Sequence, residues 1–264
     1  MSTLRRTLGR RTRILLAAGG CGLAFIVSGL VRAGAEDRIG INFTDLAGDA
    51  DHLADSEVAG AGAYAQAHWN NVDQTSGSRT GLVNQDGNAV PAVSVTWDCA
   101  NTWRSTTATD TPDQKLLKGY LDDTSNDPDP GPHVTVQQVP YSLYDVVLYL
   151  SSDTPNSFDH GAYFLADADG LDVTPRVFGG DIRTFQGTYQ QIPTDSTNPA
   201  LADPGGNYIV FEGLALESFQ VIGERTPVTR ASLAAVQIVE SLLPRISWIE
   251  ADPPTIDPGE TCRI

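Results

Sequence analysis

The chain has 264 residues, with 33 acidic and 17 basic side chains and a formal net charge of −16 at pH 7. So acidic a surface repels phosphate backbones and anionic lipid, which argues against nucleic-acid binding and against peripheral membrane binding. Strong acidity is compatible with Ca²⁺ binding or with solubility in salt, but it is also what an ordinary well-solvated surface has.

Residues 1–35 have the composition of a secretion signal. Six arginines and no acid accompany an apolar run over residues 14–31, which is followed by the small residues Ala33-Gly34-Ala35. This order of a basic region, an apolar region and a small-x-small site is typical of a cleavable signal peptide. We therefore expect cleavage after Ala35 and an extracytoplasmic protein, either secreted or held at the cell surface.

Two alternatives to cleavage after Ala35 stay open, namely a retained N-terminal anchor and a lipoprotein cut before Cys21. The pair Arg5-Arg6 faintly resembles a twin-arginine signal, so the export route is open too. Removal of residues 1–35 would leave 11 basic residues against 33 acidic ones, a net charge of −22. It would also leave Cys99 and Cys262, which could pair in an oxidising compartment or remain separate.

Short segments with alternating apolar residues recur along the rest of the chain between Gly, Pro, Asn and Asp clusters, which favours an antiparallel β-sandwich or barrel. The clearest segment is 93–99, where Val93, Val95, Trp97 and Cys99 share one face. The others are 39–43, 134–139, 144–150, 163–165, 173–178, 208–211, 219–222 and 235–239. Nine short strands suit two packed sheets. The expected core residues are Val93, Val95, Trp97, Val146, Leu148, Ile209, Phe211 and Ile238.

Helix is expected only as one or two short turns. Pro112 is suited to open a turn at 113–120, and the Ala- and Gly-rich segment 51–67 is weakly patterned. Residues 122–132 and 194–206 are rich in Pro, Gly, Asp and Asn, which predicts surface loops.

Several short motifs resemble those of jelly-roll, galactose-binding-like domains of secreted and cell-surface bacterial proteins. The resemblance covers roughly residues 39–240, within an expected domain of 36–240. It is carried by Ile41-Asn42-Phe43, Trp69-Asn70-Asn71, Val95-Thr96-Trp97, Trp103, and the segments 118–122, 144–149 and 235–239. It implies an all-β, antiparallel two-sheet jelly-roll sandwich in which the first and last strands, 39–43 and 236–239, lie side by side.

Residues 241–264 follow a different pattern. The motif Ala251-Asp252-Pro253 with Pro258-Gly259-Glu260 resembles the opening strand and first turn of bacterial immunoglobulin-like modules. We expect either a linker with the truncated start of such a module, or a tail that packs on the main domain.

Three aromatic residues with polar neighbours are candidates for sugar binding, because the apolar face of a pyranose stacks on a ring while polar groups bind its hydroxyls. They are Trp69 with Asn70, Trp103 with Asn101 and Arg104, and Tyr120 with Asp122. The competing interpretation places Trp69 and Tyr120 in or at the edge of the core. Trp103, in a run of Thr and Ser, is the best exposed candidate.

Carboxylates suggest a possible Ca²⁺ site. Asp167, Asp169 and Asp172 present three carboxylates over six residues, although the glycine spacing differs from that of an EF-hand and no glutamate closes the loop. A solvated acidic turn is the alternative. Asp122, Asp123, Asp127 and Asp129 form a second, weaker candidate.

The hydrolase motifs Gly-x-Ser-x-Gly and His-Glu-x-x-His and the phosphate-binding Gly-x-x-x-x-Gly-Lys loop do not occur. The leading hypothesis is a non-catalytic exported surface module that binds a glycan, such as cell-wall polysaccharide, or mediates adhesion. The rivals are a secreted hydrolase acting on polysaccharide and a purely structural spacer domain. Four histidines far apart in sequence leave a folded catalytic triad possible.

Overall fold

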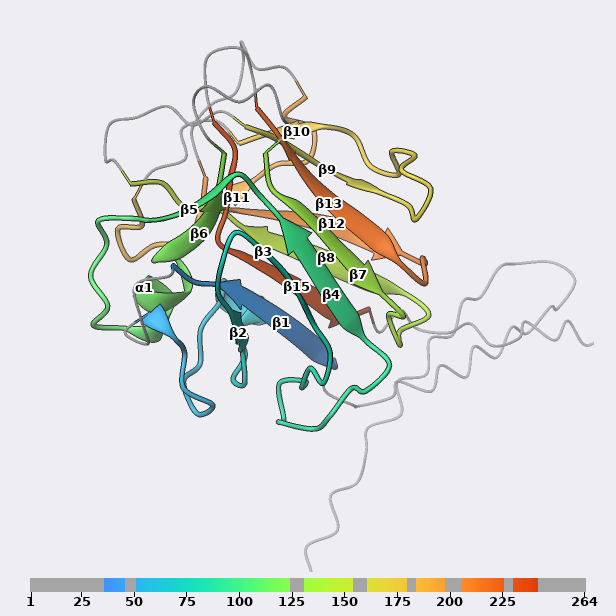
Figure 1. Cartoon of the computed structure of the whole chain (residues 1–264), viewed down its shortest axis with the longest axis horizontal. Helices are drawn as coiled ribbons and strands as arrows, with labels where there is room; N and C mark the ends of the chain where they lie inside the picture. Colours follow the sequence, from blue (N-terminus) through green and yellow to red (C-terminus); the bar gives the residue numbers. More distant parts are fainter. Residues whose placement is uncertain are drawn as a thin grey trace, which may run out of the picture. The chain divides into compact units, whose positions relative to one another are not determined.

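The computed structural model describes residues 36–45, 51–123, 131–153, 161–179, 184–197, 206–225 and 230–241 (Figure 1). The predicted secretion signal, Cys262 and the segment 242–264 lie outside these residues, so cleavage, the disulfide and the immunoglobulin-like start remain predictions. Within the described part, no helix has the length and apolar character needed to cross a membrane.

The described chain is an all-β sandwich, as predicted. The first sheet has the order β11-β12-β8-β15-β1-β2 and the second has the order β10-β9-β13-β7-β4-β3. The strands of the first sheet are β1 Arg38–Phe43, β2 Asn70–Val72, β8 Tyr144–Tyr149, β11 Gln191–Ile192, β12 Tyr208–Leu214 and β15 Ala235–Glu240. Those of the second are β3 Ser76–Arg79, β4 Ser94–Asp98, β7 His133–Gln137, β9 Ala162–Ala166, β10 Val177–Phe178 and β13 Phe219–Glu224.

The first and last strands of the domain are neighbours, which confirms the arrangement implied by the jelly-roll resemblance. β1 and β15 pair antiparallel, with Ile39 opposite Ile238 and Ile41 opposite Val236. The sheets are antiparallel except for two short pairings, β1 with β2 and β11 with β12, which are parallel. Both parallel pairings lie at an edge of the first sheet, where the outermost strand is hydrogen-bonded to a neighbouring strand on one side only.

The main core lies between the two sheets. All eight predicted core residues are buried in it. Phe43 of β1 meets Trp97 of β4 edge-on, with ring centroids 6.2 Å apart, so the two sheets are in direct contact. The alternation seen in segment 93–99 therefore marks its inner face correctly.

A second apolar cluster covers the outer face of the first sheet, and the sequence did not reveal it. It joins the outward residues of the sheet to the segment around Trp69, to helix α1 (Pro112–Leu116) and to Phe185. This cover explains why β8 and β15 are buried along almost their whole length rather than on alternate residues. The segment 51–67 contributes to the cover and contains one short 3-10 helix, η2, at Gly62–Tyr64.

Helix α1 begins where Pro112 predicted it. Thr111 caps it, since the Thr111 hydroxyl accepts from Gln114 N at 3.3 Å and Gln114 Oε1 accepts from Thr111 N at 3.0 Å. This capping box satisfies two backbone donors at the start of the helix. The predicted strand 173–178 is wrong in extent, because regular pairing with β9 covers only Val177–Phe178, and Val173 makes just a single backbone hydrogen bond to β9, to Leu165 O at 2.8 Å. Pro175 lacks the N–H that a longer strand would need.

Candidate functional site

A small third sheet, β14-β6-β5, carries the best-exposed aromatic side chain of the described residues, Trp103. Its strands are β5 Asn101–Arg104, β6 Gly119–Asp122 and β14 Ser232–Leu233. A Cβ built on Gly119 would lie 2.7 Å from Thr44 Cα, so glycine alone permits this close approach of β6 to the end of β1. The sheet is thus held against the main sandwich by backbone packing.

Four of the seven predicted ligand-binding residues meet on one face of this sheet. Asn101 lies opposite Asp122 and Trp103 lies opposite Tyr120 in the antiparallel pair β5–β6. Residues directly opposite each other in such a pair point to the same side. Two segments separated in sequence therefore bring these side chains together, as a shared site requires.

Only the β5 half of this face is accessible. Trp103 is 49 % exposed and is the one aromatic among the exposed large apolar side chains of the described residues, while Asn101 is half-buried. Tyr120 is 1 % exposed and belongs to the second apolar cluster. The prediction that Tyr120 touches a ligand is thus corrected, because its ring is covered by core side chains.

Asp122 is also buried, and its polar groups are used within the protein. Its Oδ2 accepts a hydrogen bond from Arg230 Nη1 at 2.9 Å, and its backbone oxygen accepts one from the Cys99 thiol at 2.8 Å. Burial raises the pKa of the Cys99 thiol to about 12, so this thiol stays protonated at neutral pH. Asp122 supports the face that carries Trp103 rather than forming part of its exposed surface.

Arg104 points to the opposite side of β5 from Trp103, because successive residues of a strand alternate. Its guanidinium pairs with the carboxylates of Asp45 and Asp51, with Nη2 3.3 Å from Asp51 Oδ2. Burial raises the pKa of Asp51, against the lowering effect of Arg104 and Lys118. Arg104 therefore connects β5 to the segments of Asp45 and Asp51 through ion pairs. The prediction that Arg104 shares a binding site with Trp103 is corrected.

Trp69 and Asn70 lie elsewhere, at the start of β2, and both are buried. The Trp69 ring meets Tyr149 edge-on at 5.8 Å, and its Nε1 donates to the backbone oxygens of Ala59 and Gln66 at 3.2 and 3.1 Å. Asn70 Nδ2 donates to Gly40 O and to Val83 O, each at 2.9 Å. These contacts make both residues part of the structural interior, so the prediction that they bind a ligand is corrected.

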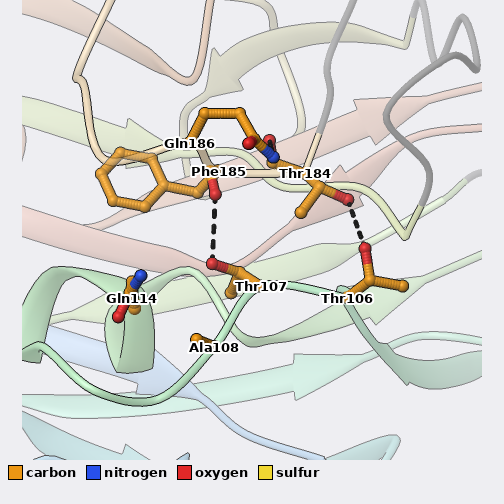
Figure 2. Close-up of a pocket in the computed structure, with 7 residues that line it drawn as sticks. All are labelled: Thr106, Thr107, Ala108, Gln114, Thr184, Phe185 and Gln186. Atoms are coloured by element: carbon orange, nitrogen blue, oxygen red, sulfur yellow. Dashed lines mark hydrogen bonds between the residues drawn. The ribbon is translucent and has the colours of Figure 1, made fainter.

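A depression of about 410 Å³ is lined in part by residues 106–108, which follow β5 in the sequence. Figure 2 shows its lining side chains. Its described lining residues are Thr106, Thr107, Ala108, Gln114, Thr184, Phe185 and Gln186. Two hydrogen bonds join its sides: Thr107 Oγ1 donates to Phe185 O at 3.1 Å, and the hydroxyls of Thr106 and Thr184 lie 3.1 Å apart. This depression was not predicted from the sequence, in which the Thr-rich run after Trp103 was its one visible signal.

The proposed Ca²⁺ ligands Asp167, Asp169 and Asp172 do not converge. Asp167 Oδ1 accepts from the backbone N–H of Asp169 and of Leu171, each at 2.9 Å, whereas Asp172 pairs with Arg176. Among the described residues, no group of three or more His, Cys, Asp or Glu side chains could hold a metal ion. The acidic segment is thus a hydrogen-bonded turn. Asp127 and Asp129 of the weaker candidate lie outside the described residues.

One histidine contacts a carboxylate near a hydroxyl, which bears on the rival hydrolase hypothesis. His52 Nε2 lies 2.8 Å from Asp73 Oδ1, and the Thr44 hydroxyl donates to that same oxygen. A catalytic triad instead needs the histidine between nucleophile and carboxylate. Here the carboxylate lies between the other two groups and Thr44 is 1 % exposed, so this trio does not have the geometry of an activated nucleophile.

Comparison with solved structures finds distant similarities, two of which are given below. No protein-family model matches the chain, and no curated protein is detectably similar to it in sequence. A crystal structure of the protein YXIM_BACsu from Bacillus subtilis aligns with a TM-score of 0.38 and 10 % identity, over 77 % of this chain and 40 % of that one. The family 32 CBM from C. perfringens NanJ in complex with galactose aligns with a TM-score of 0.33 and 10 % identity, over 55 % of this chain and 93 % of that one.

Proposed function

We propose that the protein is a non-catalytic exported surface module that binds a neutral glycan, with Trp103 as the ring on which a sugar stacks. The exposure of Trp103, 49 % on the same face as the half-buried Asn101, is the observation that carries this proposal. An indole combines a large apolar face with one polar N–H, and such groups are enriched where a surface recognises a partner. The nearby amide of Asn101 is suited to bind sugar hydroxyls.

The rival functions predict different behaviour. A polysaccharide hydrolase would cleave the glycan that it binds, and the trio of Thr44, His52 and Asp73 does not support that chemistry. A structural spacer would bind no glycan at all. The strongly acidic composition favours a neutral ligand over an acidic polysaccharide, since like charges repel.

A glycan-array screen of the purified protein, with Ca²⁺ and with EDTA, tests the proposal. We expect binding to one class of neutral glycan, and we expect it to persist in EDTA, because the carboxylates at 167–172 are held in a turn. Release of new reducing ends from a bound polysaccharide would support the hydrolase instead. Failure to bind any glycan would leave the spacer function.

A further inference from the structure

The depression lined by residues 106–108 and 184–186 presents mostly hydroxyl and amide side chains (Figure 2). None of its seven described lining residues is ionisable, in a protein whose net charge is −16. Its volume of about 410 Å³ falls in the range of roughly 300–1,000 Å³ that is common for small-molecule sites. A hollow of this size that is lined by hydroxyl and amide groups suits a ligand rich in hydroxyls.

Two amide side chains line the depression, those of Gln114 and Gln186. Each has one polar atom that makes no hydrogen bond with the described residues. Gln114 Oε1 accepts from the backbone N–H of Asp110 and Thr111, whereas its Nε2 donor makes no hydrogen bond with the described residues. Gln186 Nε2 donates to Thr184 O at 3.1 Å, whereas its Oε1 acceptor makes none within the described chain. A sugar hydroxyl both donates and accepts, so it can bind either group.

The depression and Trp103 are linked by a shared apolar cluster and by a short stretch of chain. Trp103 shares its face with Tyr120, and Tyr120 packs in the same apolar cluster as Phe185, which lines the depression. Thr106 and Ala108 follow Trp103 by three and five residues, so the backbone separates them from it by at most roughly 10 to 17 Å. One short oligosaccharide can therefore reach both features.

We infer that the depression is a second subsite of the glycan site, and that the ligand is a chain of several neutral sugars rather than one sugar. One unit stacks on the Trp103 indole, and the following units place hydroxyls against Gln114 and Gln186. This inference rests on the proposed function, because it assigns the depression to the same ligand. The hydrogen bonds between the 106–107 and 184–185 segments hold the subsite in shape before the ligand arrives.

Calorimetric titration with neutral cello-, manno-, xylo- and galacto-oligosaccharides of one to six units tests the inference. For the series that binds, we expect the Kd to fall at least tenfold between one unit and the longest chains. Ala108 lines the depression, so we expect the larger ring of Ala108→Phe to occupy part of it. Ala108 is exposed, so the fold should persist, and we expect long chains to bind this variant no more tightly than short ones. Leu171→Phe, at a position 66 % exposed in a different turn, is the matched control and should bind as the wild type.

Three outcomes separate failure of this inference from failure of the proposed function. If Ala108→Phe binds every length as tightly as the wild type, the depression is not a subsite, although the module still binds glycan. A wild-type Kd independent of chain length overturns the inference in the same way. If the wild type binds no member of any series and no glycan on the array, the proposed function itself fails.

Discussion

Replacing Trp69 by alanine is expected to lower the free energy of unfolding by about 3–5 kcal/mol, the usual cost of truncating a buried aromatic residue. Trp69 is 3 % exposed, and its Nε1 donates to two backbone oxygens. A Cβ built on Gly40 would lie 2.5 Å from Trp69 Cε3, so the ring packs directly on the backbone of β1. Truncation would leave a cavity within the second apolar cluster and would remove both indole hydrogen bonds. Chemical denaturation monitored by circular dichroism measures the loss.

Trp103→Ala is the matched control, since it removes the same side chain from a position that is 49 % exposed. Exposed substitutions of this kind usually change stability by no more than about 0.5 kcal/mol. A loss as large as that of Trp69→Ala would show that Trp103 belongs to the interior, and the proposed binding surface would then lose its anchor.

Trp103→Ala is also expected to weaken glycan binding by at least about tenfold, equivalent to about 1.4 kcal/mol, because it removes the ring on which a sugar would stack. Trp103→Tyr keeps an aromatic face and should retain most of the affinity. Titration of both variants with a glycan found on the array gives the comparison. If Trp103→Ala binds as tightly as the wild type, the recognition surface lies elsewhere.

The core residues of the main sandwich and the pairing of its first and last strands were predicted correctly from the sequence. The alternation of Val93, Val95 and Trp97 identified an inner face, because one side of that strand is buried and the other is solvated. The pairing of β1 with β15 followed from the jelly-roll resemblance and is present residue by residue. Short polar strands such as Ser76–Arg79 were missed because they have almost no apolar side chains to mark a face.

The candidate site was predicted less well, because the sequence pattern of an aromatic residue beside an amide residue is the same whether the aromatic side chain is buried or exposed. Trp69 and Trp103 both stand in such a setting, yet only a tertiary contact, the packing of Trp69 over Gly40 and against Tyr149, distinguishes them. The second apolar cluster and the depression likewise depend on segments far apart in the chain, such as 106–108 and 184–186. Local patterns carry no information about such contacts.

Nuclear magnetic resonance of the indole Nε1–H groups gives the most direct test of the claim that a sugar stacks on Trp103. The chain has four tryptophans, and loss of one resonance in Trp103→Tyr assigns the signal of Trp103. When a glycan that binds on the array is added, we expect the Trp103 resonance to shift progressively to saturation, while the buried Trp69 and Trp97 resonances stay in place. A Trp103 resonance that does not move while the glycan binds would contradict the account.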